Sequence, residues 1–130
     1  MDYRHALLHR INYYRHEHGL HRLIIGRRLQ RAATAHSINM ADHHMLSHSS
    51  YSGTNWLTRL RAYGFTGAWA GENLAVGLWT PRHVMRAWRA SPDHNANLLN
   101  GHYTAVGIGV VRGMWSGHTA YYVTADFGGR

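Results

Sequence analysis

The sequence predicts a layered α+β domain, with helices first and then a small antiparallel sheet that has a helix pair between its strands. Apolar residues recur at helical spacing through the first part of the chain. Thr80-Pro81 and Ser91-Pro92 each place a capping residue before a proline, which is a helix-start signal given twice in succession. Residues 105–111 and 119–127 are rich in β-branched and aromatic side chains, and the glycine-containing segment between them predicts a hairpin.

The first two helices follow from caps and apolar faces. Asp2 is placed to cap a helix that runs to about residue 18, and Gly19 stands at its stop position. The apolar face of this helix consists of Leu7, Leu8, Ile11 and Tyr14. Residues 20–25 form a short apolar connector to a second helix over residues 27–44. Its inward face is expected to contain Leu29, Ala32, Ala33, His36 and Met40.

The middle of the chain alternates loops with short elements. A polar loop over residues 45–53 precedes Thr54, which is expected to cap a third helix over residues 55–63 that ends at Gly64. Residues 73–77 have strand-like apolar character. The helix that starts at Pro81 carries Val84, Met85 and Trp88 on one side, and a shorter helix runs from Pro92 through Leu99. The glycines of Gly107-Ile108-Gly109 lie inside a strand pattern, which predicts close packing there.

Length and composition indicate one domain, residues 1–130, with an ordinary core. No cysteine is present, which excludes a disulfide framework, a thiol nucleophile and a cysteine-ligated metal. No apolar run approaches the roughly 18 residues of a membrane span. Met1 is followed by a charged, helix-like segment and not by a signal peptide, so the chain either is made without one or begins after it.

The charge balance is strongly basic. All fourteen basic residues are arginines, and they stand against six acids for a formal net charge of +8. This excess reflects either the nucleotide composition of the source genome or attraction to an anionic partner. Arg82, Arg86 and Arg89 share one helix face, which is either a solvated surface or a grip for an anionic polymer.

A His/Glu/His cluster is the candidate site. Leu46-Ser47-His48 and Ser91-Pro92-Asp93-His94 each supply a histidine, and Glu72 is one of only two glutamates in the chain. Two imidazoles and a carboxylate suit an open divalent-metal site. The alternative is that His48 and His94 are loop or cap histidines satisfied by backbone groups. Glu72, in an apolar context, equally fits a structural carboxylate that accepts backbone N–H bonds at a helix end.

These strings, in this order, resemble the CAP superfamily, named after cysteine-rich secretory proteins, antigen 5 and pathogenesis-related 1, in its bacterial SCP-like form. The similarity runs the whole length of the chain. The residues that carry it are Asn12, Arg15 and Gly19-Leu20, Leu46-Ser47-His48, Gly71-Glu72-Asn73-Leu74-Ala75, Ser91 to Asn100, Val106-Gly107-Ile108-Gly109, and Thr124-Ala125-Asp126-Phe127-Gly128. The resemblance implies a three-layer α-β-α sandwich with a small, mainly antiparallel central sheet, and a central cleft lined by two histidines and two acids.

Carried over by position, the resemblance makes His48 and His94 the two histidines and Glu72 the first acid. His94 precedes Gly107 by the family's offset of thirteen residues, whereas His102 precedes it by five and is expected at the rim. The second acid follows a tryptophan by three residues in eukaryotic members. Ser91 stands at that position after Trp88, so the four-residue set is reduced and a two-carboxylate mechanism is in doubt.

We therefore expect a secreted or cell-envelope domain that acts mainly by binding. His48 and His94 would hold a divalent cation, with zinc the expected metal. Glu72 would orient a water or an imidazole, and Asn73 and Ser91 would line the cleft.

Two alternatives remain. One is a metal-dependent, peptidase-like hydrolase in which Glu72 acts as the catalytic base. The other is a binder of lipid, sterol or an anionic cell-envelope polymer, through the cleft or the Arg82, Arg86 and Arg89 face. Nucleic acid is the less favoured partner.

Overall fold

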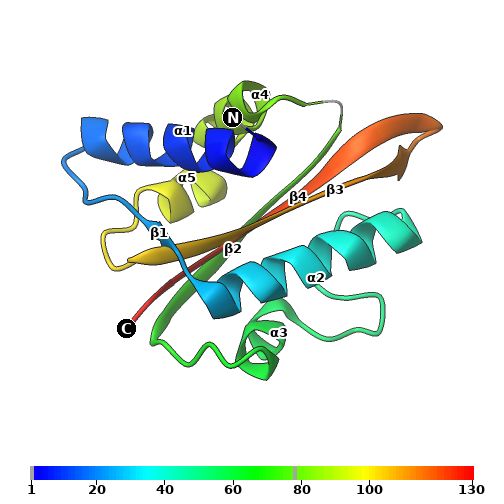
Figure 1. Ribbon diagram of the computed structural model, residues 1–130, viewed down its shortest axis with the longest axis horizontal. Coiled ribbons are helices and arrows are strands. Elements are labelled where there is room, and N and C mark those ends of the chain that lie inside the picture. Colours follow the sequence, from blue (N-terminus) through cyan, green and yellow to red (C-terminus); the bar gives the residue numbers. More distant parts are fainter. Residues whose placement is uncertain (1, 78) are drawn as a thin grey trace.

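A four-stranded sheet forms the middle layer of the computed structural model, which describes residues 2–77 and 79–130. One face of the sheet is covered by α1 (Tyr3–Glu17), α4 (Pro81–Ala90) and α5 (Pro92–Leu98), and the other by α2 (Arg27–His43) and α3 (Trp56–Ala62) (Figure 1). The predicted three-layer α-β-α sandwich is thereby confirmed. Within the described ranges, no helix is long and apolar enough to cross a membrane.

The strands lie in the order β1-β3-β4-β2. Their bounds are β1 (Ile24–Ile25), β2 (Trp69–Gly77), β3 (Ala105–Trp115) and β4 (His118–Gly129). The short β1 pairs parallel to β3, and the other pairs are antiparallel, so the sheet is mixed but mainly antiparallel. Among the described strands, β2 pairs with β4 and forms one edge of the sheet, and its side chains alternate between the two helical layers.

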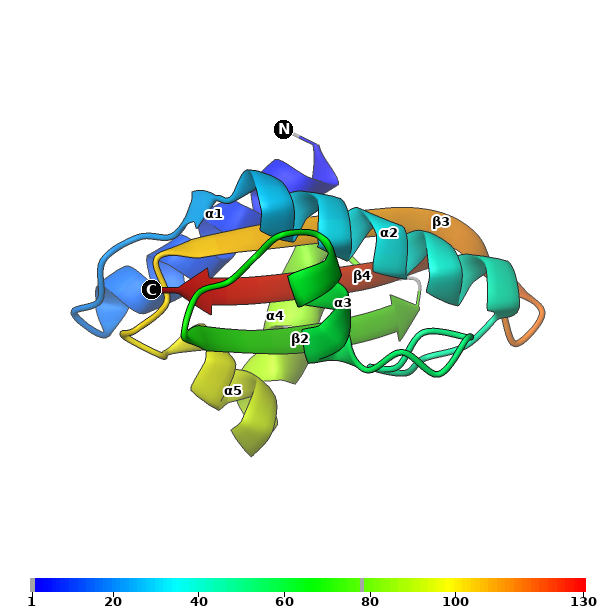
Figure 2. The ribbon, with the colours of Figure 1, turned by 90° about the horizontal axis from the view of Figure 1, so that it is seen from below.

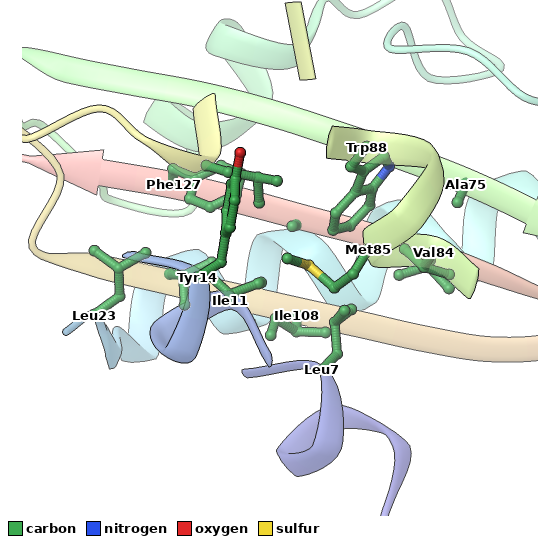
Figure 3. Close-up of a cluster of buried hydrophobic side chains, with 14 of the residues drawn as sticks. Leu7, Ile11, Tyr14, Leu23, Ala75, Val84, Met85, Trp88, Ile108 and Phe127 are labelled. Atoms are coloured by element: carbon green, nitrogen blue, oxygen red, sulfur yellow. The ribbon is translucent and has the colours of Figure 1, made fainter. Parts of the chain in front are cut away.

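The larger core lies between the sheet and the α1, α4 and α5 layer. The side chain of Asp2 accepts a hydrogen bond from the backbone N–H of His5 at 2.9 Å and so caps α1, as predicted. Leu7, Ile11 and Tyr14 of α1 then meet Met85 and Trp88 of α4 above the sheet (Figure 3). Buried Arg15 donates to the carbonyls of Leu98, Asn100 and Tyr103, so α1 also fixes the end of α5.

The opposite layer depends on the close approach of α2 to the sheet (Figure 2). A Cβ atom at Gly107 would lie 2.2 Å from the backbone carbonyl of Leu29, and one at Gly109 would lie 2.3 Å from the carbonyl oxygen of Ala33. The close packing predicted for these glycines is confirmed. The five inward residues expected on α2 are all buried.

Four boundaries differ from the sequence prediction. Asn55, and not Thr54, caps α3, because its side chain accepts from the N–H of Thr58 at 2.8 Å. Strand β2 begins at Trp69, so it contains Glu72. The hairpin turn is only Ser116-Gly117, whose φ angles are both positive, and β3 and β4 extend to meet it. Part of the connector before α2 forms β1 through its pairing with β3, a long-range contact that local sequence does not reveal.

Candidate functional site

The edge strand β2 presents Gly71, Glu72 and Asn73 alternately to the two layers. Gly71 faces α5, and a Cβ atom there would lie 2.5 Å from Oδ1 of Asn97. Asn73 faces the same way and donates from Nδ2 to the backbone carbonyl of His94 at 3.1 Å. Glu72 points to the opposite face, toward the loop that carries His48. Glu72 and Asn73 thus connect loop 45–53 to α5 around the sheet edge.

The side chains of His48 and Glu72 meet directly. Nδ1 of His48 lies 2.9 Å from Oε1 of Glu72, and the side chains are 51% and 1% exposed respectively. Since the carboxylate accepts, the imidazole N–H sits on Nδ1, and Nε2 of neutral His48 is left with a free lone pair. A buried carboxylate that orients a half-exposed imidazole is the arrangement that commonly supports metal-binding histidines.

Arg59, from α3, completes the environment of Glu72. It donates from Nη1 to Oε2 of Glu72 at 2.5 Å and from Nη2 to the backbone carbonyl of His48. Burial by itself would raise the pKa of Glu72, but the hydrogen bonds of Asp126, His48 and Arg59 outweigh it and lower that pKa to about 2. The carboxylate is therefore ionised and both of its oxygens are engaged. It is not the helix-end acceptor of backbone N–H bonds that the sequence left open.

A second carboxyl group belongs to Asp126 of β4, which is the cross-strand partner of Glu72 on β2. Its side chain is fully buried, and among the described residues no N–H or hydroxyl group donates to either of its oxygens. Burial, followed by the hydrogen bond and the charge of Glu72, raises the pKa of Asp126 well above its ordinary value. Asp126 is therefore protonated, which avoids a second negative charge beside the Glu72 carboxylate.

His36 of α2 anchors the loop that carries His48. Its buried imidazole donates from Nε2 to the carbonyl of Ser47 at 2.6 Å. Burial and the nearby charge of Arg59 lower the pKa of His36, so it stays neutral at physiological pH. The backbone carbonyls of Ser47 and His48 are therefore held by side chains from α2 and α3 respectively.

His94 lies in the first turns of α5 and is half-buried. Burial lowers its pKa, and a positive charge on His48 would lower it further. His94 is therefore neutral at physiological pH and has a lone pair to offer. Its backbone is fixed by Asn73, and Asn73 in turn accepts from Nδ2 of Asn97 at 2.9 Å.

These residues fit a metal only as an open, two-imidazole site. Glu72 already satisfies both carboxylate oxygens within the protein. Across residues 2–77 and 79–130, no group of three or more histidine, cysteine or acidic side chains is placed to hold a metal ion. A bound cation would therefore take nitrogen from His48 and His94 and its remaining ligands from water or a binding partner.

Ser91, His102 and three arginines of α4 were also predicted from the sequence, for the cleft or for an anion-binding face. Ser91 joins α4 to α5 and makes no side-chain capping bond. His102 stacks on Trp69 with ring centroids 3.7 Å apart, at the start of β2. The arginines Arg82, Arg86 and Arg89 are exposed on α4.

Three residues of the cluster were missed from the sequence: Arg59, Asn97 and Asp126. Asp126 gave a signal that went unused, because it is the only acid inside the apolar strand pattern of residues 119–127. Asn97 lies in the string that supplied His94. For Arg59 the sequence gives no signal, since it is one arginine among fourteen.

Fold and site together define a helix-flanked sheet protein with a histidine–carboxylate cluster at its edge strand. A family model for the cysteine-rich secretory protein family, CAP, matches residues 8–127, and the chain belongs to this family. The proposed resemblance is thereby confirmed.

Similar proteins come from bacteria. The uncharacterized protein YkwD of Bacillus subtilis is 35% identical over 97 residues, which are 75% of this chain and 38% of YkwD. A crystal structure of an extracellular protein containing a SCP domain from Bacillus anthracis has a TM-score of 0.78 and 27% identity, over 95% of this chain and 39% of that one. An outer surface protein of Borrelia burgdorferi has a TM-score of 0.82 and 25% identity, over 100% and 96% of the two chains. The match thus covers well under half the length of YkwD.

Proposed function

We propose that this CAP domain is an extracytoplasmic binding module whose His48 and His94 imidazoles hold a divalent cation, zinc being the expected metal. The observation that carries the proposal is the hydrogen bond from His48 Nδ1 to the buried Glu72 carboxylate, which leaves Nε2 free as a ligand. Burial lowers the pKa of His94, the other proposed ligand, which favours its neutral, metal-ligating form. The descriptions of similar structures as an extracellular protein and an outer surface protein support a location in the cell envelope or outside the cell.

Binding is favoured over hydrolysis by the state of Glu72. A general base works best with a pKa near the working pH and a free oxygen pointed at the proton it takes. Glu72 has a pKa of about 2, and both oxygens are engaged by His48 and Arg59. Asp126, the neighbouring carboxyl group, is fully buried and protonated. Glu72 is therefore suited to orient His48 and poorly suited to activate water.

Calorimetric titration with zinc chloride near pH 7 tests the proposal. We expect His48→Ala and His94→Ala each to weaken zinc binding at least about tenfold, since each removes one of two protein ligands. Glu72→Gln should weaken it by about tenfold through the loss of the orienting carboxylate. Far-UV circular dichroism would establish that each variant is folded.

The control is His118→Ala, because the chain has thirteen histidines and His118 is exposed at the far hairpin. This change should leave zinc affinity within about twofold of the unmodified protein. Equal losses in the His118 variant and in the His48 or His94 variant would overturn the assignment. Unchanged affinity on removal of His48 and His94 would do the same.

A further inference from the structure

A basic groove runs between α1 and α4, on the helical layer that Arg15 ties together. Two adjoining hollows, of about 560 and 570 Å³, form it. Both are lined by Arg10 and Tyr14 of α1 and by Met85 and Arg89 of α4, so they are continuous. The groove is therefore elongated and open, with a cationic side chain on each wall.

The charges of the groove are uncompensated. No acid lines the second hollow, whereas four arginines do, and these are Arg10, Arg82, Arg86 and Arg89. One carboxylate, Glu17, borders the first hollow. In the part of the chain that the structure describes, none of the four arginines forms an ion pair. Their guanidinium groups are thus available to an outside anion.

Helix stability does not account for these arginines. Arg82 stands in the first turn of α4, where the helix dipole disfavours a cation, and that turn contains no acid. Arg82 and Arg86 are four residues apart, so like charges lie on neighbouring turns of one face. Arg89 stacks over the Tyr14 ring at 4.5 Å, which aims a third cation into the same groove. An anion bound in the groove would relieve this repulsion.

From this juxtaposition we infer that the groove between α1 and α4 binds a linear, base-free phosphodiester polymer with sugar or polyol units between its phosphates. The continuity of the two hollows favours a chain over a compact ion. Arg10 and Arg89 lie on opposite walls, and the non-bridging oxygens of one phosphate can meet guanidinium groups on both. A carboxylate polymer fits the two walls less well, because a planar carboxylate directs both of its oxygens to one side. None of the residues that line the groove belongs to the His48–Glu72–His94 cluster, and the inference does not depend on the function proposed for that cluster.

Aromatic side chains in the groove argue against nucleic acid. Single-stranded nucleic acids bind to aromatic platforms on which successive bases stack. The ring of Tyr14 is already occupied, since Arg89 lies over it and His18 packs against it edge-on at 4.6 Å. Tyr13, which is 60% exposed, is the remaining tyrosine of the groove. The exposed imidazole of His9 lines the same hollow. These two rings, both on α1, can lie against a sugar or polyol unit but provide no row of stacking sites along the groove.

Fluorescence anisotropy with a labelled poly(glycerol phosphate) oligomer tests the inference on the whole chain. We expect measurable binding at low salt that weakens at least about tenfold between about 50 and 200 mM NaCl. Arg10→Gln/Arg86→Gln/Arg89→Gln should weaken it at least about tenfold at fixed salt. Thermal unfolding checks that the variant folds. Arg82→Gln/Arg86→Gln, which leaves the Tyr14 stack intact, gives a second variant with a smaller expected loss.

The matched control is Arg27→Gln/Arg28→Gln/Arg31→Gln on α2, in the opposite layer. It removes three exposed arginines from one helix, one of which also lies over a tyrosine, Tyr63. This control should weaken binding less than about threefold, as expected of general charge alone. Equal losses in the two triple variants, or no binding to the oligomer at all, would overturn the inference. Tighter binding of oligothymidylate or of polyglutamate of equal charge would also overturn it.

Discussion

Glu72 shows how a single residue can be a structural ion and a positioning group at once. Its buried carboxylate accepts from Arg59 and His48 and lies beside protonated Asp126, so the cluster contains a buried ion pair and a neutral acid. Removing one partner of such a buried pair is far more costly than its net contribution, because the other charge is left without a partner. The stability of the fold and the orientation of His48 therefore depend on the same atoms.

We predict that Glu72→Gln destabilises the protein by about 3 kcal/mol at pH 7, as measured by urea unfolding. The folded-state pKa of Glu72, about 2, lies below its ordinary value of 4.5. Its contribution to stability is therefore complete above about pH 4.5 and is lost as the pH falls toward 2. The difference between the variant and the unmodified protein should shrink over that range.

Glu17→Gln is the natural control, since Glu17 is the other glutamate and is exposed at the end of α1. It should change the free energy of unfolding by less than about 0.5 kcal/mol at any pH in the range. A Glu72→Gln difference that stays constant from pH 7 to pH 2 would mean that Glu72 is not held ionised by its neighbours.

At the scale of elements, local sequence predicted what depends on local chemistry. The caps at Asp2 and Thr80 and the start of the helix at Pro81 were predicted correctly, because each rests on one or two adjacent residues. Strand β1 and the beginning of β2 were missed, because a strand is completed by a partner distant in the chain. The same reason explains the site: His48, Glu72 and His94 were found by motif, whereas the partners Arg59 and Asp126 come from other elements.

The packing of α2 on β3 gives a prediction at this scale. Gly107→Ala should destabilise the protein by about 2 kcal/mol or more in urea unfolding, because its Cβ atom would meet the Leu29 backbone at 2.2 Å and a backbone must move. Gly101→Ala is the control, since its Cβ atom would lie 3.5 Å from the nearest atom, Leu20 Cδ2, and should cost less than about 0.5 kcal/mol. Similar costs for the two changes would show that α2 does not press on β3.

At the scale of the whole molecule, the charge is more one-sided at the surface than composition suggests. Arg15 and Arg59 are the two buried arginines, which leaves twelve exposed. Two of the six acids, Glu72 and Asp126, are buried in the site, so only four face solvent. The fold thus uses part of its few acids internally and leaves its surface strongly cationic.

We predict that this repulsion makes the protein more stable in salt. Raising NaCl from about 20 to about 200 mM shortens the screening length to below about 10 Å, so stability should rise, on the order of 1 kcal/mol, with a higher melting temperature in calorimetry. The Arg10, Arg86 and Arg89 triple variant and the Arg27, Arg28 and Arg31 triple variant should both show a smaller rise, because each has lost three positive charges. A melting temperature that falls with salt would mean that surface ion pairs outweigh the repulsion, contrary to the excess of exposed arginines over exposed acids.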